Sequence, residues 1–376
     1  MQLPTVDEDF ARWAEETAAS LFAPPGPGDD SGRVDRDLVR RLGDAGLLPA
    51  LFPGVGSGAL DQEAPARHIC AMREELARRD THAETALALQ GLGTYPLVQS
   101  GTPAQRAAWI PRVAAGDAVA AFALSEPDAG SDAAALALRA EADGAGWRLS
   151  GEKTWISNAP DADFYTVFAR TTPDRGARGV TAFLVPGDRP GLRGEPLDML
   201  SPHALGHLTF DGVVVTEEDV VGEVDRGFRV AMRTLDLFRP SVGAFAVGMA
   251  RAALDAARTH TAQRSAFGGT LSDLQTVRHT LAEMATRIEA ARLLVYSAAA
   301  EYDVSGPLVT RNAAMAKLFA TETAQYVVDA AMQMHGARAL RRGHLLEHLY
   351  REVRAPRVYE GATEVQREII ARQLLS

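Results

Sequence analysis

The sequence predicts a mainly α-helical protein with a central β domain, because helical patterns occupy both ends of the chain and strand-like runs its middle. Up to about Asp117, and again after Glu223, apolar residues recur at helical spacing. Between these points, β-rich runs are separated by turn residues. A chain of 376 residues is too long for one comfortable core. We therefore expect a helical domain at 1–117, a β domain at 118–224 and a helical bundle at 225–376.

The N-terminal domain is expected to hold four helical segments. They cover residues 6–22, 36–45, 64–89 and 103–114. A Pro/Gly/Asp-rich stretch at 24–32 and a glycine-containing loop at 52–58 interrupt them. Thr102 is placed to cap the last segment, with Pro103 at its first helical position.

The middle domain is expected to be built from short strands. They cover residues 118–124, 136–142, 147–152, 164–169, 180–185 and 208–215. Asp143-Gly144 and Asp211-Gly212 are turn signals, and the first predicts a β-hairpin around Gly144.

The C-terminal domain carries the clearest helical stripe in the chain. Its residues are spaced alternately three and four apart, as in a helix packed in a bundle: Leu274, Val277, Leu281, Met284, Ile288, Ala291 and Val295. Neighbouring helices are expected at 230–263 and 308–333, and a last helix at 363–374.

Composition excludes several classes of protein. The net charge of −10 and a pI near 5.5 argue against a nucleic-acid-binding domain, which usually has a basic face. Cys70 is the only cysteine, so no internal disulfide is possible, and a buried hydrophobe is the better interpretation of it. No signal peptide and no membrane span are predicted, and no metal-ligand cluster stands out. We expect a cytoplasmic protein.

Two segments of the middle domain have local patterns that suit a bound cofactor. Residues 122–132 lead from a strand into a turn of small and hydroxyl side chains, which brings backbone N–H groups close to a ligand. Residues 151–158 alternate like a strand and place Trp155 and Ser157 on one face, where indole and hydroxyl can meet an aromatic ring. An ordinary strand exit and a core tryptophan are the alternatives that the local patterns leave open.

A third segment, 350–365, carries a candidate base. Pro356 disfavours helix at the residue before it, and Glu360-Gly361 precede a helix that Thr363 can cap. A carboxylate on such a turn can project into a cleft as a general base. On local evidence alone, a solvated loop glutamate is the preferred interpretation.

Together with three further motifs, these segments resemble the acyl-CoA dehydrogenase family. The further motifs are Gly-Thr-Pro-Ala-Gln-Arg at 101–106, Arg-Ser-Ala-Phe-Gly at 264–268 followed by Gln275, and Gln-Met-His-Gly at 333–336. The six motifs are collinear, and the resemblance runs from about Glu74 to Arg372. It implies an N-terminal helical domain, a β-barrel or sandwich in the middle and a C-terminal four-helix bundle. It also implies an enzyme that binds FAD and oxidises an acyl thioester.

The resemblance also implies roles for individual residues. Cofactor contacts are expected from Phe122, Leu124, Ser125, Trp155, Ser157, Arg264, Phe267, Gln275, Gln333, Gly336, Ala337, Ala362 and Glu364. Substrate contacts are expected from Ser131, Asp236, Arg239 and Gly361. A structural ion pair is an equally good interpretation of Arg239.

In the family pattern Glu360 is the catalytic base that removes the substrate α-proton. Some relatives carry the base at the position of Phe238, which cannot act as one. The thioester carbonyl needs hydrogen-bond donors where enolate charge develops, and the backbone N–H at Glu360 is one of them. Burial against an apolar ligand should raise the pKa of the carboxyl.

Three alanines depart from the family pattern on the flavin side. Ala266, Ala337 and Ala362 replace residues that usually offer more hydrogen bonding or flexibility, and each lost hydrogen bond is worth roughly 0.5–1.5 kcal/mol. Arg338 is a candidate to compensate by pairing with the FAD pyrophosphate.

Several functional alternatives remain open at this point. The first expectation is an acyl-CoA dehydrogenase of fatty acid metabolism that passes electrons to an electron-transfer flavoprotein and assembles as a homotetramer. A dehydrogenase of acyl-carrier-protein thioesters in specialised metabolism is the second. A flavin oxidase or monooxygenase is the third. The non-enzyme alternative is a protein that binds FAD or a ligand without turnover.

Overall fold

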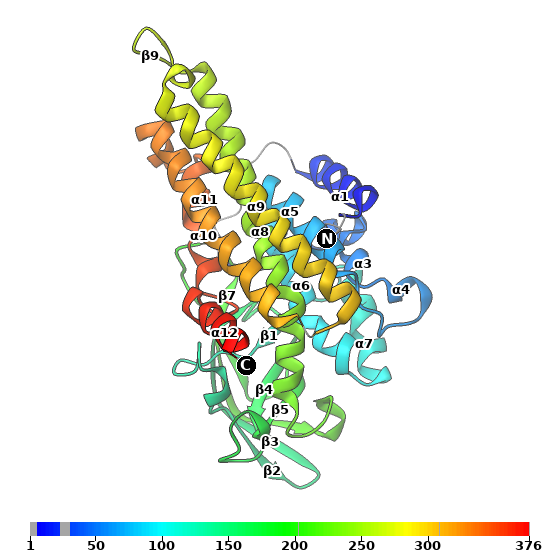
Figure 1. Ribbon diagram of the computed structural model, residues 1–376. Helices are drawn as coiled ribbons and strands as arrows, with labels where there is room; N and C mark the ends of the chain where they lie inside the picture. Colours follow the sequence, from blue (N-terminus) through cyan, green and yellow to red (C-terminus); the bar gives the residue numbers. More distant parts are fainter. Residues whose placement is uncertain (1–5, 23–30, 202, 308, 376) are drawn as a thin grey trace. The chain divides into compact units, whose positions relative to one another are not determined.

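The computed structural model describes residues 6–22, 31–201, 203–307 and 309–375. Its mainly helical composition with strands in the middle of the chain is the predicted fold class (Figure 1). The chain forms two compact units. Unit 1 comprises Met1–Gly28, Pro65–Glu84 and Asp236–Ser376, and unit 2 comprises Asp29–Ala64 and Thr85–Leu235. The predicted breaker stretch at 24–32 lies mostly outside the described residues, and the three-domain division stays a prediction.

The helices before the sheet follow the predicted pattern in outline. They are α1 (Glu8–Leu21), α2 (Arg36–Asp44), α3 (Leu47–Leu51), α4 (Gly54–Ser57), α5 (Ala66–Arg79), α6 (Thr81–Ser100) and α7 (Pro103–Ala114). The start of α7 is as predicted, with Pro103 in its first turn and a reciprocal capping box between Thr102 and Gln105.

Two expectations for this region were wrong. The single helix predicted at 64–89 is two helices, because Asp80 leaves helical geometry and its side chain accepts a hydrogen bond from the backbone N–H of Ala83 (2.9 Å). Asp80 thus caps α6. The predicted loop at 52–58 contains the helical turn α4. A Cβ on Gly54 would lie 1.9 Å from the carbonyl oxygen of Ala59, so glycine permits this close approach.

Unit 2 contains one mixed sheet with the order β6-β7-β3-β2-β4-β5-β8, and β1 pairs with β4 in parallel. The strands are β1 (Ala120–Ala123), β2 (Arg139–Asp143), β3 (Gly146–Ser157), β4 (Phe164–Arg170), β5 (Val180–Pro186), β6 (Leu192–Pro196), β7 (Leu205–Thr216) and β8 (Val220–Val221). The predicted hairpin at Gly144 joins β2 to β3, with Asp143 opposite Gly146 and a positive φ of 61° at Gly144.

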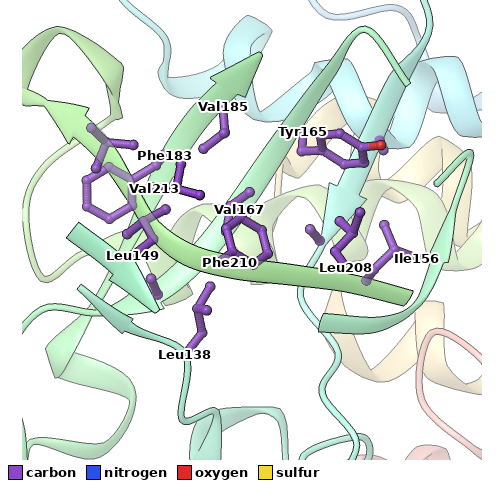
Figure 2. Close-up of a cluster of buried hydrophobic side chains, with 14 of the residues drawn as sticks. Leu138, Leu149, Ile156, Tyr165, Val167, Phe183, Val185, Leu208, Phe210 and Val213 are labelled. Atoms are coloured by element: carbon purple, nitrogen blue, oxygen red, sulfur yellow. The ribbon is translucent and has the colours of Figure 1, made fainter. Parts of the chain in front are cut away.

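The core of the sheet is built from alternate residues of its strands. On β7, Leu208, Phe210, Val213 and Val215 are buried (Figure 2). Phe183 and Val185 of β5 join the same cluster. Both β4 and β5 are buried along almost their whole length, which explains their continuous apolar sequences.

The sequence missed part of the sheet. Asp211-Gly212 is not a turn between strands but lies inside β7, next to a register shift against β3. Strand β6 is mostly exposed and polar, so it carries no hydrophobic alternation, and β8 has only two residues.

Unit 1 is built around long helices (Figure 1). They are α8 (Gly227–Gln263), α9 (Gln275–Ser305) and α10 (Thr310–His335), followed by α11 (Leu345–Glu352) and α12 (Thr363–Leu375). The predicted stripe on α9 is buried at Met284, Ile288, Ala291 and Val295. Its first three residues are only half-buried in the single chain. Cys70 is a buried free thiol, as predicted.

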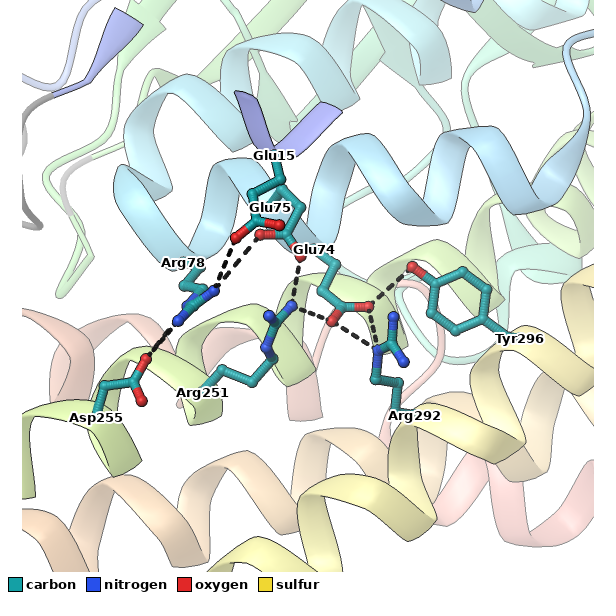
Figure 3. A network of polar contacts seen from close by, with 8 residues as sticks. All are labelled: Glu15, Glu74, Glu75, Arg78, Arg251, Asp255, Arg292 and Tyr296. Carbon is teal, nitrogen blue, oxygen red and sulfur yellow. Dashed lines mark hydrogen bonds and ion pairs between the residues drawn. The ribbon is translucent and has the colours of Figure 1, made fainter. Parts of the chain in front are cut away.

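A buried carboxylate joins three helices of unit 1. Glu74 on α5 is fully buried and pairs with Arg251 of α8. It also accepts hydrogen bonds from Arg292 Nε (2.9 Å) and the Tyr296 hydroxyl (2.9 Å) of α9 (Figure 3). Charge-assisted hydrogen bonds from three side chains compensate for removing this carboxylate from water.

No helix in the described part of the chain combines the length and apolar character needed to cross a bilayer. Within the same residues, no group of three or more His, Cys, Asp or Glu side chains is arranged to hold a metal ion.

Candidate active site

Glu360 lies on a tight turn immediately before α12. Its φ is +51° and that of Gly361 is +93°, so two consecutive residues are left-handed. Such a conformation costs a non-glycine residue about 1–3 kcal/mol and persists only where the surroundings impose it. At Gly361 a Cβ would lie 2.5 Å from Gln366 Nε2, which excludes larger side chains.

The carbonyl groups of this turn are held by three side chains from the bundle. Lys317 Nζ of α10 donates to the Gly361 carbonyl oxygen (2.7 Å). Gln366 Nε2 of α12 donates to the carbonyl oxygens of both Glu360 (3.0 Å) and Gly361 (2.9 Å), and Arg239 Nε of α8 approaches that of Glu360 (3.4 Å). These contacts fix the strained turn, and with it the direction of the Glu360 side chain.

Glu360 is half-buried, and one oxygen of its carboxyl is shielded from water. Its Oε2 atom is buried and accepts no hydrogen bond from the described residues. Burial raises the pKa of Glu360 above the usual range, while the charges of Arg73, Lys317 and Arg239 act in the opposite direction. An unpaired buried carboxylate of raised pKa has the properties of a general base awaiting a substrate proton.

The α8 turn beside this carboxyl holds two of the four predicted substrate residues. Arg239 Nη1 pairs with Asp236 Oδ1 (3.0 Å), and Thr310 donates to Asp236 Oδ2 (3.2 Å). Arg239 therefore makes the ion pair of the structural interpretation and also contacts the base turn. Phe238, which lies between Asp236 and Arg239 in the sequence, is fully buried.

A charged pair that the sequence did not reveal lies in the same region. Arg73 of α5 pairs with Glu84 of α6, and its Nη1 donates to Ser241 Oγ of α8 (2.7 Å). Ser241 in turn donates to the Phe238 carbonyl oxygen (2.7 Å). The side chains of Arg73 and Glu84 are only 4% and 1% exposed. Of the cations that lower the pKa of Glu360, Arg73 has the largest effect.

In unit 2, the loop after β1 is anchored to β3. Lys153 Nζ, fully buried, donates to the Leu124 carbonyl oxygen (2.9 Å) and to Glu126 Oε1 (2.7 Å). The Thr154 N–H donates to the Ser125 carbonyl oxygen (3.0 Å). Burial lowers the pKa of Lys153 to about 8, although the charge of Glu126 acts to raise it.

The predicted flavin-side residues of this loop and of β3 differ in exposure. Phe122 and Ser125 are half-buried and Leu124 is buried, whereas Ser131 is exposed. Trp155 is 52% exposed and has a positive φ of 58°, at the register shift of β3 against β7. Ser157, two residues on, is half-buried.

Other predicted cofactor residues lie where α8 and α10 end. Arg264 precedes a small hairpin of β9 (Ser265–Ala266) and β10 (Gly269–Thr270). Phe267 at its tip has a φ of +54° and is 90% exposed, and Gln275 is an exposed residue at the start of α9.

The end of α10 meets the end of α8 through two histidines. His260 and His335 stack with ring centroids 4.1 Å apart, and the charges of Arg338 and Arg264 both lower the pKa of His260, after the larger effect of burial. The structure thus gathers Arg264 and Arg338 at one end of the bundle. Gln333, Gly336 and Ala337 are exposed there, and Gly336 ends α10 with a φ of +62°.

The predicted cap of the last helix was wrong. Thr363 Oγ1 donates to Glu322 Oε1 of α10 (2.8 Å) instead of capping α12, and the Ala362 carbonyl accepts the Gln366 N–H (3.0 Å). Ala362 is half-buried, and Glu364 is exposed on the first turn of α12.

These features suit FAD, each within its own unit. In unit 2, the exposed indole of Trp155, the hydroxyl of Ser157 and the loop after β1 can contact a flat ring with polar edges. In unit 1, the two arginines and the exposed Phe267 offer charge for a diphosphate and a surface for an aromatic base.

The distribution of lysine adds a signal that motif reading overlooked. Of 39 Lys and Arg residues, only Lys153 and Lys317 are lysine. Both are fully buried, both donate to a backbone carbonyl of a predicted site loop, and burial lowers the pKa of each to about 8. At each position a compact ammonium donates to its carbonyl from within the protein interior.

Three family models match this chain. The N-terminal, middle and C-terminal domains of acyl-CoA dehydrogenase match residues 6–117, 121–213 and 225–375. The bovine mitochondrial short-chain specific acyl-CoA dehydrogenase is 39% identical over 381 residues, covering all of this chain and 91% of its own length.

Solved structures agree with these matches. Butyryl-CoA dehydrogenase from Megasphaera elsdenii superposes with a TM-score of 0.90 at 32% identity, over the full length of both chains. The prolyl acyl carrier protein oxidase AnaB superposes with a TM-score of 0.89 at 25% identity, over 98% of each chain. The chain belongs to the acyl-CoA dehydrogenase family and is an FAD-dependent oxidoreductase.

Proposed function

We propose that this protein dehydrogenates an acyl-CoA thioester between its α and β carbons, with Glu360 as the base. The observation that carries the proposal is the buried, unpaired Oε2 of Glu360 on a turn held by Lys317, Arg239 and Gln366. The relatives named short-chain specific acyl-CoA dehydrogenase and butyryl-CoA dehydrogenase support a short acyl group.

The side chain and the backbone of the base turn have different roles in proton removal. The Glu360 carboxylate accepts the α-proton, and its raised pKa makes it a stronger base than an exposed glutamate. The backbone N–H at Glu360 donates to the thioester carbonyl, where negative charge develops as the proton leaves. FAD, when bound, accepts the β-hydrogen as hydride.

The remaining predicted residues are proposed to bind and orient. Asp236, Arg239 and Gly361 would contact the substrate arm, and Ser131 its phosphorylated part. The loop residues Phe122, Leu124 and Ser125, with Trp155 and Ser157, would hold the flavin ring. Cofactor contacts of the bundle would come from Arg264, Phe267, Gln275, Gln333, Gly336, Ala337, Ala362 and Glu364.

Replacing Lys317 with methionine should slow proton removal and change its pH dependence. Loss of a hydrogen bond from a charged donor costs about 1.5–3 kcal/mol, so we expect kcat to fall roughly tenfold to a hundredfold. Loss of the positive charge should raise the pKa of Glu360 further, so the acid limb of the kcat profile should move to higher pH. Steady-state kinetics across pH measure both effects.

Two further variants separate positioning from general destabilisation. Lys317→Arg keeps the charge and should keep the acid limb close to its original pH. Lys153→Met removes the other buried lysine, which lies in unit 2, and should leave the acid limb unmoved. An unchanged pH profile in Lys317→Met would show that Lys317 has no influence on the base.

Anaerobic titration of the purified protein tests the reaction itself. We expect a yellow protein whose flavin absorbance bleaches with a short acyl-CoA and does not return quickly in air. Rapid reoxidation by air would favour an oxidase, and bleaching only by carrier-protein thioesters would favour the second candidate, which the similarity to AnaB supports. A colourless protein that takes up no FAD would overturn the proposal.

The partners and the assembly follow the family pattern in our proposal. An electron-transfer flavoprotein would reoxidise the enzyme, and four copies would form a homotetramer. The division into domains at 1–117, 118–224 and 225–376 is supported by the bounds of the three family-model matches.

A further inference from the structure

Apart from the effect of Arg73 on the pKa of Glu360, the buried pair of Arg73 and Glu84 has no part in the chemistry proposed above. Replacing a buried ion pair by apolar residues of similar volume is often neutral or stabilising. An enzyme for a plain alkyl chain would gain from apolar residues at these positions. The pair therefore calls for an explanation in terms of what it binds.

The hydrogen bonds of Arg73 leave part of its guanidinium unused. A guanidinium has five N–H donors. Within the described residues, Arg73 donates from Nε to Glu84 and from Nη1 to Ser241 Oγ, and Nη2 donates to none of them. The Arg73 side chain is only 4% exposed, yet one of its charged N–H groups has no partner among the described residues.

One turn of α8 connects this donor to the base. Ser241 accepts from Arg73 and donates to the Phe238 carbonyl, while Arg239 reaches the Glu360 carbonyl. Arg73 and Glu360 also act on each other electrostatically. A group on the acyl chain of a substrate that meets Glu360 is therefore close to the arginine.

The charges around Arg73 decide which group fits. Glu84 already neutralises the guanidinium, and Glu360 is a second carboxylate in the vicinity. A carboxylate on the substrate would face both of them, which is unfavourable. A neutral oxygen can accept from Arg73 Nη2 without adding charge, and a plain methyl group would leave this donor unsatisfied.

We propose that Arg73, held by Glu84 and Ser241, selects acyl thioesters whose chain carries a neutral oxygen, such as a hydroxyl group. This selection rests on the proposed function, since it concerns the substrate of the same site. Arg73 is a specificity-determining residue in this role, and Glu84 positions it.

Matched substrates test the selection directly. Hydroxyacyl-CoAs are compared with the alkyl thioesters in which methyl replaces hydroxyl, for example 4-hydroxybutyryl-CoA with pentanoyl-CoA, over a series of chain lengths. Succinyl-CoA serves as the carboxylate probe. We expect kcat/KM to favour the hydroxyl compound at least tenfold at one chain length, with succinyl-CoA slower. A preference for the alkyl compound at every length would overturn the proposal.

Variants show whether Arg73 is responsible. Arg73→Lys keeps the charge but loses Nη2, and it should abolish the preference while the melting temperature stays close to that of the original protein. Arg78→Lys on the same helix, which pairs with Asp255, is the matched control and should keep the preference. If Arg73→Lys retained the full preference, another residue would be the selector.

Binding of unreactive ligands separates this inference from the proposed function. Thioethers of CoA with a hydroxylated or a plain alkyl chain cannot lose an acidified α-proton, so calorimetry measures their affinity alone. Failure of every thioester to bleach the flavin would contradict the proposed function. Equal affinity of the two thioethers, together with equal kcat/KM of the matched thioesters, would contradict the selection only.

Discussion

Glu360→Gln is expected to bind FAD normally and to lose about two to four orders of magnitude in the rate of flavin reduction by the acyl thioester. This range is typical for the loss of a general base. The amide has almost the same shape as the carboxyl and keeps the turn, whose carbonyl groups are held by Lys317 and Gln366. Rapid mixing under anaerobic conditions measures the rate, and the flavin spectrum measures cofactor content.

The pH dependence of the original protein gives a second measure of the same carboxyl. The base acts only when it is deprotonated, and burial raises its pKa. Activity should therefore fall with decreasing pH, beginning at a higher pH than an exposed glutamate would cause. Glu368→Gln, which removes an exposed carboxylate paired with Arg372 on α12, should leave rate and profile unchanged. Normal turnover by Glu360→Gln would mean that another group removes the proton.

Glu74→Gln is expected to cause the largest loss of stability among single charge changes in unit 1. The variant leaves Arg292 without its buried counter-charge and leaves Arg251 with Glu75 alone. Removing one partner of a buried pair costs about 3–5 kcal/mol, and the lower end applies here because both arginines are partly exposed. We expect a loss of about 3 kcal/mol in the free energy of unfolding and a lower Tm.

An exposed pair on the same bundle provides the control. Glu283 and Arg287 of α9 lie 2.6 Å apart at side-chain exposures of 49% and 44%. Pairs of this kind contribute about 0.3–0.5 kcal/mol, so Glu283→Gln should hardly change the Tm. Equal effects of the two variants, measured by calorimetry or urea unfolding, would contradict the role given to Glu74.

The elements that the sequence predicted well have strong periodic patterns or clear end signals. The stripe on α9 and the Thr102–Pro103 start of α7 are of this kind. The break at Asp80 was missed because no glycine or proline marks it, and the cap depends on one aspartate side chain. Strand β6 was missed because its position at the edge of the sheet leaves it exposed and polar.

The candidate site was predictable only where residues are close in sequence. Glu360 and Gly361 are adjacent in one motif, so their turn could be predicted from the local sequence. Lys317 and Arg73 come from helices far from Glu360 in the chain, so tertiary structure alone brings their charges to it. The rarity of lysine is a sequence signal that could have pointed to Lys317, because the chain uses arginine almost everywhere else, but the motifs did not include it.

Because the chain has only two lysines, spectroscopy can follow each lysine without signals from others. Selective isotopic labelling of lysine would place one reporter beneath the base turn and one beneath the loop after β1, with no background from surface side chains. A Lys317→Met sample assigns the two signals by subtraction. Nuclear magnetic resonance could then follow the base turn and the loop after β1 separately as cofactor and thioester are added.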